Sequence, residues 1–232
     1  MRTVSATLIN DICARAQEQA RGIQIFSEPL TRGRAVTWIE QHSLRNLALS
    51  WVFRPAWMSR CEDLAVVEKT IGQIREELVH DDKIGRGHRG LLHELAAAMG
   101  VSKERLAAVQ PLMSTRGAFA IWENMTRTQP WTHGWIATSH GEYLVIATDS
   151  KTLDPAHWKA QFALSDEQVF FLSYHQKADL EHGGAEVWQP LLKWIKTEEQ
   201  ARGVLEAVDL AVYASWLFYE GIVDYGDART DV

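Results

Sequence analysis

The segment 165–184, SDEQVFFLSYHQKADLEHGG, places the strongest constraint on how this chain can fold. At the helical spacing of 100° per residue, His175, Asp179 and His182 fall within roughly 60° of one another. The aromatic run that precedes them predicts that this helix packs against other parts of the protein. Two histidines and one aspartate in a single narrow stripe favour a metal site over a solvated helix face.

Local signals support a helix across this segment. Ser165 followed by Gln168 is typical of a capping box, in which the two side chains bond each other's backbone N–H groups. Asp166 and Glu167 suit the positive end of the helix dipole. The glycine pair that follows His182 supplies a stop.

The rest of the chain repeats the helical period and predicts an all-α protein. Sustained alternation of apolar and polar residues, hairpin dipeptides and internal repeats are missing from the sequence. We therefore expect a single domain over residues 1–232 with seven to nine helices. Besides 165–182, helices are expected at 4–22, 35–53 with a break or kink at Pro55, 62–80, 88–100, 102 to about 125 with a kink at Pro111, 131–147, 155–162 and 198 to about 223.

Composition limits the class of protein. The chain has 232 residues, is 46% hydrophobic and carries a formal net charge of −6 with no basic block. Nucleic acid and anionic membranes are therefore not expected as partners. Cys13 and Cys61 are too few for a disulfide framework and indicate a cytoplasmic protein. The sequence has no apolar run long enough to span a membrane.

Further acidic residues lie where they could complete a metal site. Two divalent cations need more negative charge than two imidazoles and one aspartate supply. Glu77 and Asp81 are four residues apart beside the apolar stripe of the 62–80 helix and are expected to face the core. His88 begins the next helix, where a cationic imidazole gains nothing from the dipole, which favours a neutral, metal-bound ring. Glu142 is an acid within an otherwise apolar stretch.

This order of residues resembles the haem-oxygenase-like diiron oxidases and oxygenases, whose fold group also holds thiaminase-like and pyrroloquinoline-quinone-synthase-like proteins. The resemblance covers residues from about 35 to 225. The matching pieces are Glu77-Leu78, the HRGLL run that begins at His88, Gly141-Glu142 and the HQKADLEH run that begins at His175.

The resemblance implies a haem-oxygenase-like helical domain that binds two Fe²⁺ ions. The implied ligands are Glu77, His88, Glu142, His175, Asp179 and His182; Asp81 is an alternative to Glu77, and His80 also stays open. The last four of the six implied ligands would be catalytic.

The activity implied is that of a non-haem diiron oxidoreductase with dioxygen as co-substrate and a peroxo-diferric intermediate. Its substrate would be a small amine- or amino-acid-type metabolite, undergoing N-oxygenation or oxidative C–C cleavage in the biosynthesis of a natural product. An aromatic pocket and an arginine clamp for a carboxylate could lie near the metals, although plain core packing is the more frequent role of such aromatic residues. The candidates are Trp122, Trp131, Trp135, Phe171 and Tyr174 for the pocket and Arg75, Arg86 or Arg89 for the clamp.

Two other functions compete with this one. A metal-independent thiaminase-like or quinone-synthase-like enzyme could share the fold, although the sequence has no cysteine after Cys61 to serve a thiaminase. A non-catalytic helical binding protein is the other alternative. The apolar residues of the last helix fit either a homodimer interface or an inner face against the core.

Overall fold

The computed structural model describes residues 5–28, 30–148, 154–182 and 188–232. Within these ranges the regular structure is helical apart from one isolated bridge, which confirms the prediction of a single all-α domain. Nine described helices have at least eight residues: α1 (Ser5–Ala20), α3 (Arg32–Ala48), α5 (Leu64–Leu78), α6 (His88–Ala98), α8 (Met113–Thr128), α9 (Trp131–Thr148), α10 (Pro155–Phe162), α11 (Phe170–His182) and α13 (Glu198–Ala228). The shorter elements are α2 (Gln24–Ser27), η1, a π-helix (Leu49–Phe53), α4 (Arg54–Met58), α7 (Lys103–Ala108) and α12 (Leu191–Trp194).

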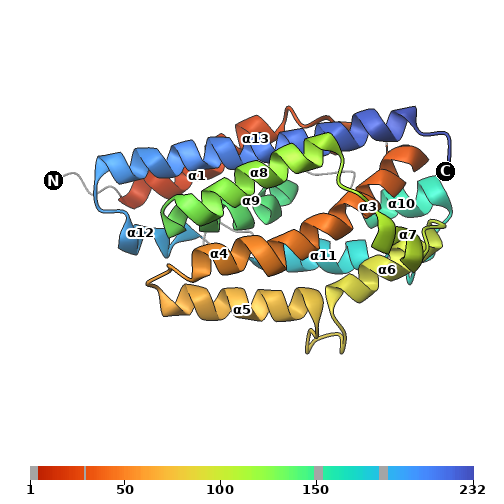
Figure 1. The fold of residues 1–232 in the computed structure, drawn as a ribbon, viewed down its shortest axis with the longest axis horizontal. Coiled ribbons are helices and arrows are strands. Elements are labelled where there is room, and N and C mark those ends of the chain that lie inside the picture. Colours follow the sequence, from red (N-terminus) through yellow and green to blue (C-terminus); the bar gives the residue numbers. More distant parts are fainter. Residues whose placement is uncertain (1–4, 29, 149–153, 183–187) are drawn as a thin grey trace.

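Helix α13 is the element around which the bundle is built. It runs along the length of the molecule and packs against α1, α3, α8 and α9 (Figure 1). Its first turn is held by a capping box, because the Thr197 hydroxyl accepts from the Gln200 N–H and the Gln200 side chain accepts from the Thr197 N–H. Its inward residues, Phe218 and Ile222 among them, are fully buried.

Helices α3 and α13 cross at two glycines. A Cβ placed on Gly33 would lie 2.1 Å from the Gly226 carbonyl oxygen, so neither position accepts a side chain without moving the backbone. Beside the crossing, the Arg34 guanidinium donates to both carboxylate oxygens of Asp227 at 2.6 Å. This close approach brings the end of α13 against the start of α3.

Pro55 produces a π-helix. The ring of a proline clashes with the carbonyl four residues earlier, which for Pro55 is that of Trp51. The chain responds by widening to η1, in which the Arg54 N–H donates to the Leu49 carbonyl, and the helix then continues as α4. The break or kink predicted at Pro55 is thus one widened, π-helical turn.

Two sequence predictions of helix extent were wrong. The segment 102–125 is two helices, α7 and α8, because Pro111 lacks an N–H and disfavours helical geometry in the residue before it. Helix α11 begins at Phe170, although both capping-box bonds between Ser165 and Gln168 form. From residue 169 to residue 173, some backbone N–H groups donate to the carbonyl three residues earlier and others to the carbonyl four residues earlier. The regular α-helix therefore starts after the residues that cap it.

Three elements carry the candidate site described below. Helix α5 lies along the edge of the bundle opposite α13 in Figure 1 and contacts α6 and η1. Helix α11 packs against α6 and α9. The Asp63 carboxylate caps α5 by accepting from the Ala65 N–H and also from the Trp194 indole, which ties the start of α5 to α12.

His140 joins α9 to α13 in the core. Its Nδ1–H donates to the Ile136 carbonyl at 3.0 Å, so its Nε2 accepts from the Ser215 hydroxyl at 2.7 Å. Burial lowers the pKa of His140 to about 4, and the nearby charge of Arg45 adds to this effect. The ring is therefore neutral in the folded protein at pH 7.

We expect Gly226→Ala to lower the free energy of unfolding by more than about 2 kcal/mol, because its methyl group would overlap the α3 backbone. Gly72→Ala is the matched control, since nothing lies within 4 Å of a Cβ there. In the interior of α5 the alanine should stabilise by roughly 0.5–1 kcal/mol. Urea unfolding at pH 7 measures both changes. Equal effects of the two substitutions would contradict the close crossing.

We expect the free energy of unfolding to fall as the pH is lowered from 6.5 towards 4, because the unfolded chain protonates His140 and the folded protein does not. The loss between pH 7 and pH 5 from this group should be about 2 kcal/mol. Urea unfolding of wild type and His140→Gln at the two pH values isolates it. Identical losses in the two proteins would show that His140 does not contribute.

Candidate functional site

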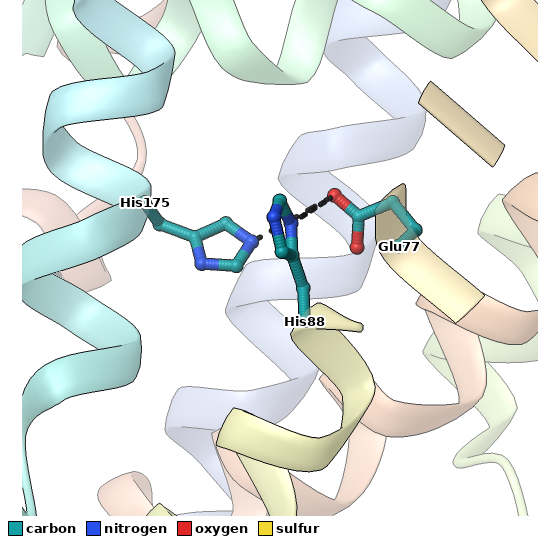
Figure 2. A group of neighbouring side chains, drawn as sticks. All are labelled: Glu77, His88 and His175. Atoms are coloured by element: carbon teal, nitrogen blue, oxygen red, sulfur yellow. Dashed lines mark hydrogen bonds and ion pairs between the residues drawn. The ribbon is translucent and has the colours of Figure 1, made fainter. Parts of the chain in front are cut away.

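Glu77, His88 and His175 converge from three helices. Figure 2 shows both imidazole rings directed toward the Glu77 carboxylate. The Glu77 Oε1 lies 3.1 Å from His88 Nδ1 and 3.7 Å from His175 Nε2. One potential ligand atom from each of the three residues lies within 4.8 Å of those of the other two. The structure thus brings together three of the residues singled out in the sequence.

The loop between α5 and α6 turns His88 back onto Glu77. The Asp81 N–H donates to the Arg86 carbonyl at 3.1 Å, and Gly85 takes a positive φ of 70° inside this turn. Gly87 passes so close to the end of α5 that a Cβ there would lie 3.0 Å from the Val79 nitrogen. Asp81 therefore lies in the loop, as its composition predicted, and this turn rather than helical spacing from Glu77 directs its side chain inward.

Asp81 binds the far side of the His88 ring. Its Oδ2 lies 3.0 Å from His88 Nε2 and accepts a short hydrogen bond from the Tyr174 hydroxyl. Its other oxygen accepts from the Lys83 N–H at 2.8 Å. His88 thus lies between two carboxylates, Glu77 at one ring nitrogen and Asp81 at the other.

The carboxylates and His88 stabilise one another's charge. Burial opposes the ionisation of Glu77, but hydrogen bonds from His175 and His88 hold its pKa well below the ordinary value. Burial likewise opposes protonation of His88, yet bonds to Glu77 and Asp81 raise its pKa to about 9. The pKa of Asp81 falls to about 2 against the cost of its burial, because Tyr174 and His88 donate to it. Without a metal ion, His88 is an imidazolium.

The donor set fits a divalent transition metal. His175 Nδ1 donates to the Phe171 carbonyl at 3.0 Å, so its Nε2 lies on the side of Glu77, where loss of the Nε2 proton would free a lone pair for a metal ion. Asp81 accepts from His88 Nε2–H, so loss of the Nδ1 proton presents a second lone pair to the same point. Two imidazoles and one carboxylate, each ring oriented by a second acceptor, are the ligands typical of non-haem ferrous sites.

A cavity of about 70 Å³ borders Glu77 and His175. This volume admits several water molecules. Its walls come from α3, η1, α5, α9 and α11, with Arg54 of α4 and Tyr219 of α13. The polar lining residues are His42, Arg45, Asn46, Ser50, Arg54, Glu77, Thr138 and His175, and the apolar ones include Trp38, Leu49 and Phe171.

Other predicted site residues lie elsewhere or outside the description. Glu142 lies on α9 and Asp179 and His182 lie on α11, but their side chains are outside the part of the chain that the structure describes. His80 Nε2 lies 3.3 Å from Asp82 on the exposed outer side of the loop, away from the cluster.

The predicted arginine clamp was wrong. Arg75 pairs with Asp82 at 2.9 Å, Arg86 pairs with Glu94, and Arg89 is exposed, so none of them lines the cavity. Of the five predicted pocket aromatics, only Phe171 is a lining residue.

Sequence reasoning missed the polar wall formed by α3. His42, Arg45 and Asn46 share a helical face with Trp38, and that spacing was the available signal. Asn46 also donates to Glu77 Oε2 at 3.5 Å, which links this wall to the cluster.

Comparison with known proteins identifies the family. A family model described as "iron-containing redox enzyme" matches residues 57–216, a span that holds the three residues of the cluster. The chain belongs to this family. No curated protein matches it.

Solved structures show that members of the haem-oxygenase-like fold group share its architecture. A domain of unknown function with a haem oxygenase-like fold from Shewanella denitrificans OS217 is 14% identical, with a TM-score of 0.71 over 93% of this chain and 90% of that one. A CADD-like protein of unknown function from Nostoc punctiforme PCC 73102 is 15% identical, with a TM-score of 0.71 over 95% and 99%. A TenA homolog from Pseudomonas syringae pv. tomato str. DC3000 is 15% identical, with a TM-score of 0.66 over 94% and 91%. Such low identities establish the fold alone.

Among the described helices, none combines the length and the apolar character needed to cross a bilayer.

We expect Asp81→Asn to weaken ferrous binding about 10- to 100-fold, because the neutral amide is a poorer acceptor for His88 Nε2–H and orients the ring less firmly. Asp82→Asn is the matched control, since that neighbouring carboxylate pairs with exposed Arg75. Anaerobic titration of metal-free protein against a chromophoric ferrous chelator measures the affinities. Equal affinities of the two variants would contradict a role for Asp81 in holding His88.

Proposed function

We propose that this protein is a non-haem iron enzyme that uses dioxygen to oxidise a small amine- or amino-acid-type metabolite. The observation that carries the proposal is the convergence of Glu77, His88 and His175 beside a polar cavity. The family's description as an iron-containing redox enzyme supports the choice of metal. The oxidation would be an N-oxygenation or an oxidative C–C cleavage, as members resembling this chain carry out.

Each residue of the cluster would have a distinct task. The Glu77 carboxylate would compensate the metal's charge, and His88 Nδ1 and His175 Nε2 would complete three positions, leaving others open. When bound, ferrous iron supplies a site for dioxygen and the electrons that reduce it. Asp81 and Tyr174 would keep the His88 ring oriented, and we assign Asp81 this positioning role and Glu77 the role of ligand.

A second iron ion would use the remaining predicted ligands. Glu142, Asp179 and His182 lie on α9 and α11, two helices that pack against each other. Since α11 also supplies His175, one helix would serve both ions. This part of the proposal rests on the sequence spacing and on the contact between the two helices.

A metal-independent enzyme is the second candidate. One observation favours it. Hydrogen bonds already connect Glu77 to His88, His88 to Asp81 and Asp81 to Tyr174, as in an acid–base relay that needs no metal ion. The fold shared with a TenA homolog is compatible with this alternative. Activity that persists after chelator treatment would favour it.

We expect anaerobic loading with ferrous iron to give about two iron ions per chain. When the loaded protein is then mixed with dioxygen, we expect dioxygen to be consumed and a transient visible absorbance band to form. Glu77→Gln should lose at least one bound iron, because it removes the anionic ligand. Glu76→Gln is the control, since it removes the same charge one residue away and outside the cluster.

Iron analysis and stopped-flow absorbance provide the two measurements. Wild-type protein that takes up no iron, or Glu77→Gln that binds as much as Glu76→Gln, would overturn the proposed metal site. Iron uptake without dioxygen consumption would overturn the proposed reaction.

A further inference from the structure

Three polar atoms along one wall of the cavity have no partner. The buried atoms Arg45 Nε, Ser50 Oγ and His42 Nδ1 make no hydrogen bond in the described structure, and all three residues line the cavity. Buried polar groups are hydrogen-bonded in the great majority of cases, because leaving one unpaired is unfavourable. Three of them facing one small space indicate a site built for a polar ligand.

Arg45 is the charged residue among these three. Other arginines that lie deep in the bundle are paired: Arg34 with Asp227 and Glu28, and Arg229 with Glu40 at 2.7 Å. Arg45 has no carboxylate partner among the described residues; its guanidinium carbon instead lies 5.6 Å from the centroid of the Trp122 ring. A partly buried guanidinium that lies over an aromatic face, with no carboxylate partner among the described residues, keeps its capacity to bind an anion.

The surrounding backbone holds the guanidinium in place. A Cβ on Gly141 would lie 2.3 Å from Arg45 Nη2, so α9 approaches the arginine as closely as a glycine permits. The guanidinium therefore lies between the Trp122 ring and the α9 backbone. Such fixation reduces the conformational entropy that would be lost when a ligand binds.

The π-helix places Ser50 on the same wall. His42, Arg45 and Leu49 share a face at spacings of three and four residues in α3. The wider turn of η1 carries Ser50 and then Arg54 onto the lining of the same cavity. Single π-helical turns within α-helices often occur at functional sites.

We propose that Arg45 and Ser50 form a carboxylate-binding subsite that holds an acidic substrate beside Glu77 and His175. The arginine would donate from Nε to one carboxylate oxygen, and the serine hydroxyl would donate to the same group. This role for the subsite rests on the proposed function. It restricts the proposed substrates to molecules that carry a carboxylate. Its place in the cavity wall puts the rest of the ligand next to the cluster.

The probe for the test is acetate, which fits a cavity of this size, with acetamide as its neutral counterpart. Binding to chelator-treated, desalted protein is followed by tryptophan fluorescence, because Trp38 lines the cavity and Trp122 contacts Arg45. We expect saturable binding of acetate at constant ionic strength and at least tenfold weaker binding of acetamide. Arg45→Gln should weaken acetate binding at least about tenfold.

Arg127→Gln is the matched control, because it removes the same charge from an exposed arginine that pairs with Glu123. Its acetate affinity should stay within twofold of wild type. If Arg45→Gln does not fold, as judged by circular dichroism, Ser50→Ala decides: a several-fold loss supports the subsite, and an unchanged affinity overturns it. Arg45→Gln that binds like Arg127→Gln, or acetamide that binds as tightly as acetate, also overturns it.

The metal site is tested separately in the same proteins. Because the acetate measurements use metal-free protein, their outcome does not depend on iron binding. Arg45→Gln should take up as much ferrous iron as wild type, since it supplies no ligand atom to the cluster. Loss of acetate binding with normal iron uptake would identify the subsite, whereas iron uptake that fails in wild type would overturn only the proposed function.

Discussion

The largely buried Glu77 carboxylate, whose side chain is 20% exposed, is the group on which the candidate site depends. Ionised and largely withdrawn from water, it is stabilised by two imidazoles and by Asn46 at 3.5 Å. An unpaired carboxylate in this position would cost several kcal/mol, so α3, α6 and α11 must each bring a donor to it. A metal ion would replace the proton that His88 shares with Glu77 and satisfy the same charge. The cluster is therefore suited both to folding without metal and to binding one.

The fold supplies these donors at helix ends and at distortions. Glu77 lies in the last turn of α5, His88 is the first residue of α6, and the loop between them is short enough that the two face each other. The opposite wall depends on Pro55, whose effect on the helix before it widens one turn into η1 and brings Ser50 to the cavity. Helix α13 holds the framework that these local features need, since α3 and α9 both pack on it.

Much of this arrangement could be predicted from the sequence because it depends on local signals. Capping residues and apolar stripes located α5 and α13 within a few residues, and Glu77, His88 and His175 were found from their residue types and spacing. Asp81 was expected to face the core, but its bond to the far side of the His88 ring could not be predicted, because that bond follows from how the loop bends. Arg45 was missed because a polar residue on a helix is ordinarily solvated, and only packing against Trp122 and Gly141 makes it a wall of the cavity. The two-helix form of 102–128 likewise depends on how Pro111 is accommodated.

The most direct test of the central claim is an anomalous difference map at the iron edge from crystals loaded anaerobically with ferrous iron. We predict an anomalous peak within bonding distance of the Glu77 carboxylate, His88 Nδ1 and His175 Nε2, with Asp81 still hydrogen-bonded to His88 Nε2. A map without a peak among these three residues, in a crystal where His88 remains hydrogen-bonded to Glu77, would contradict it.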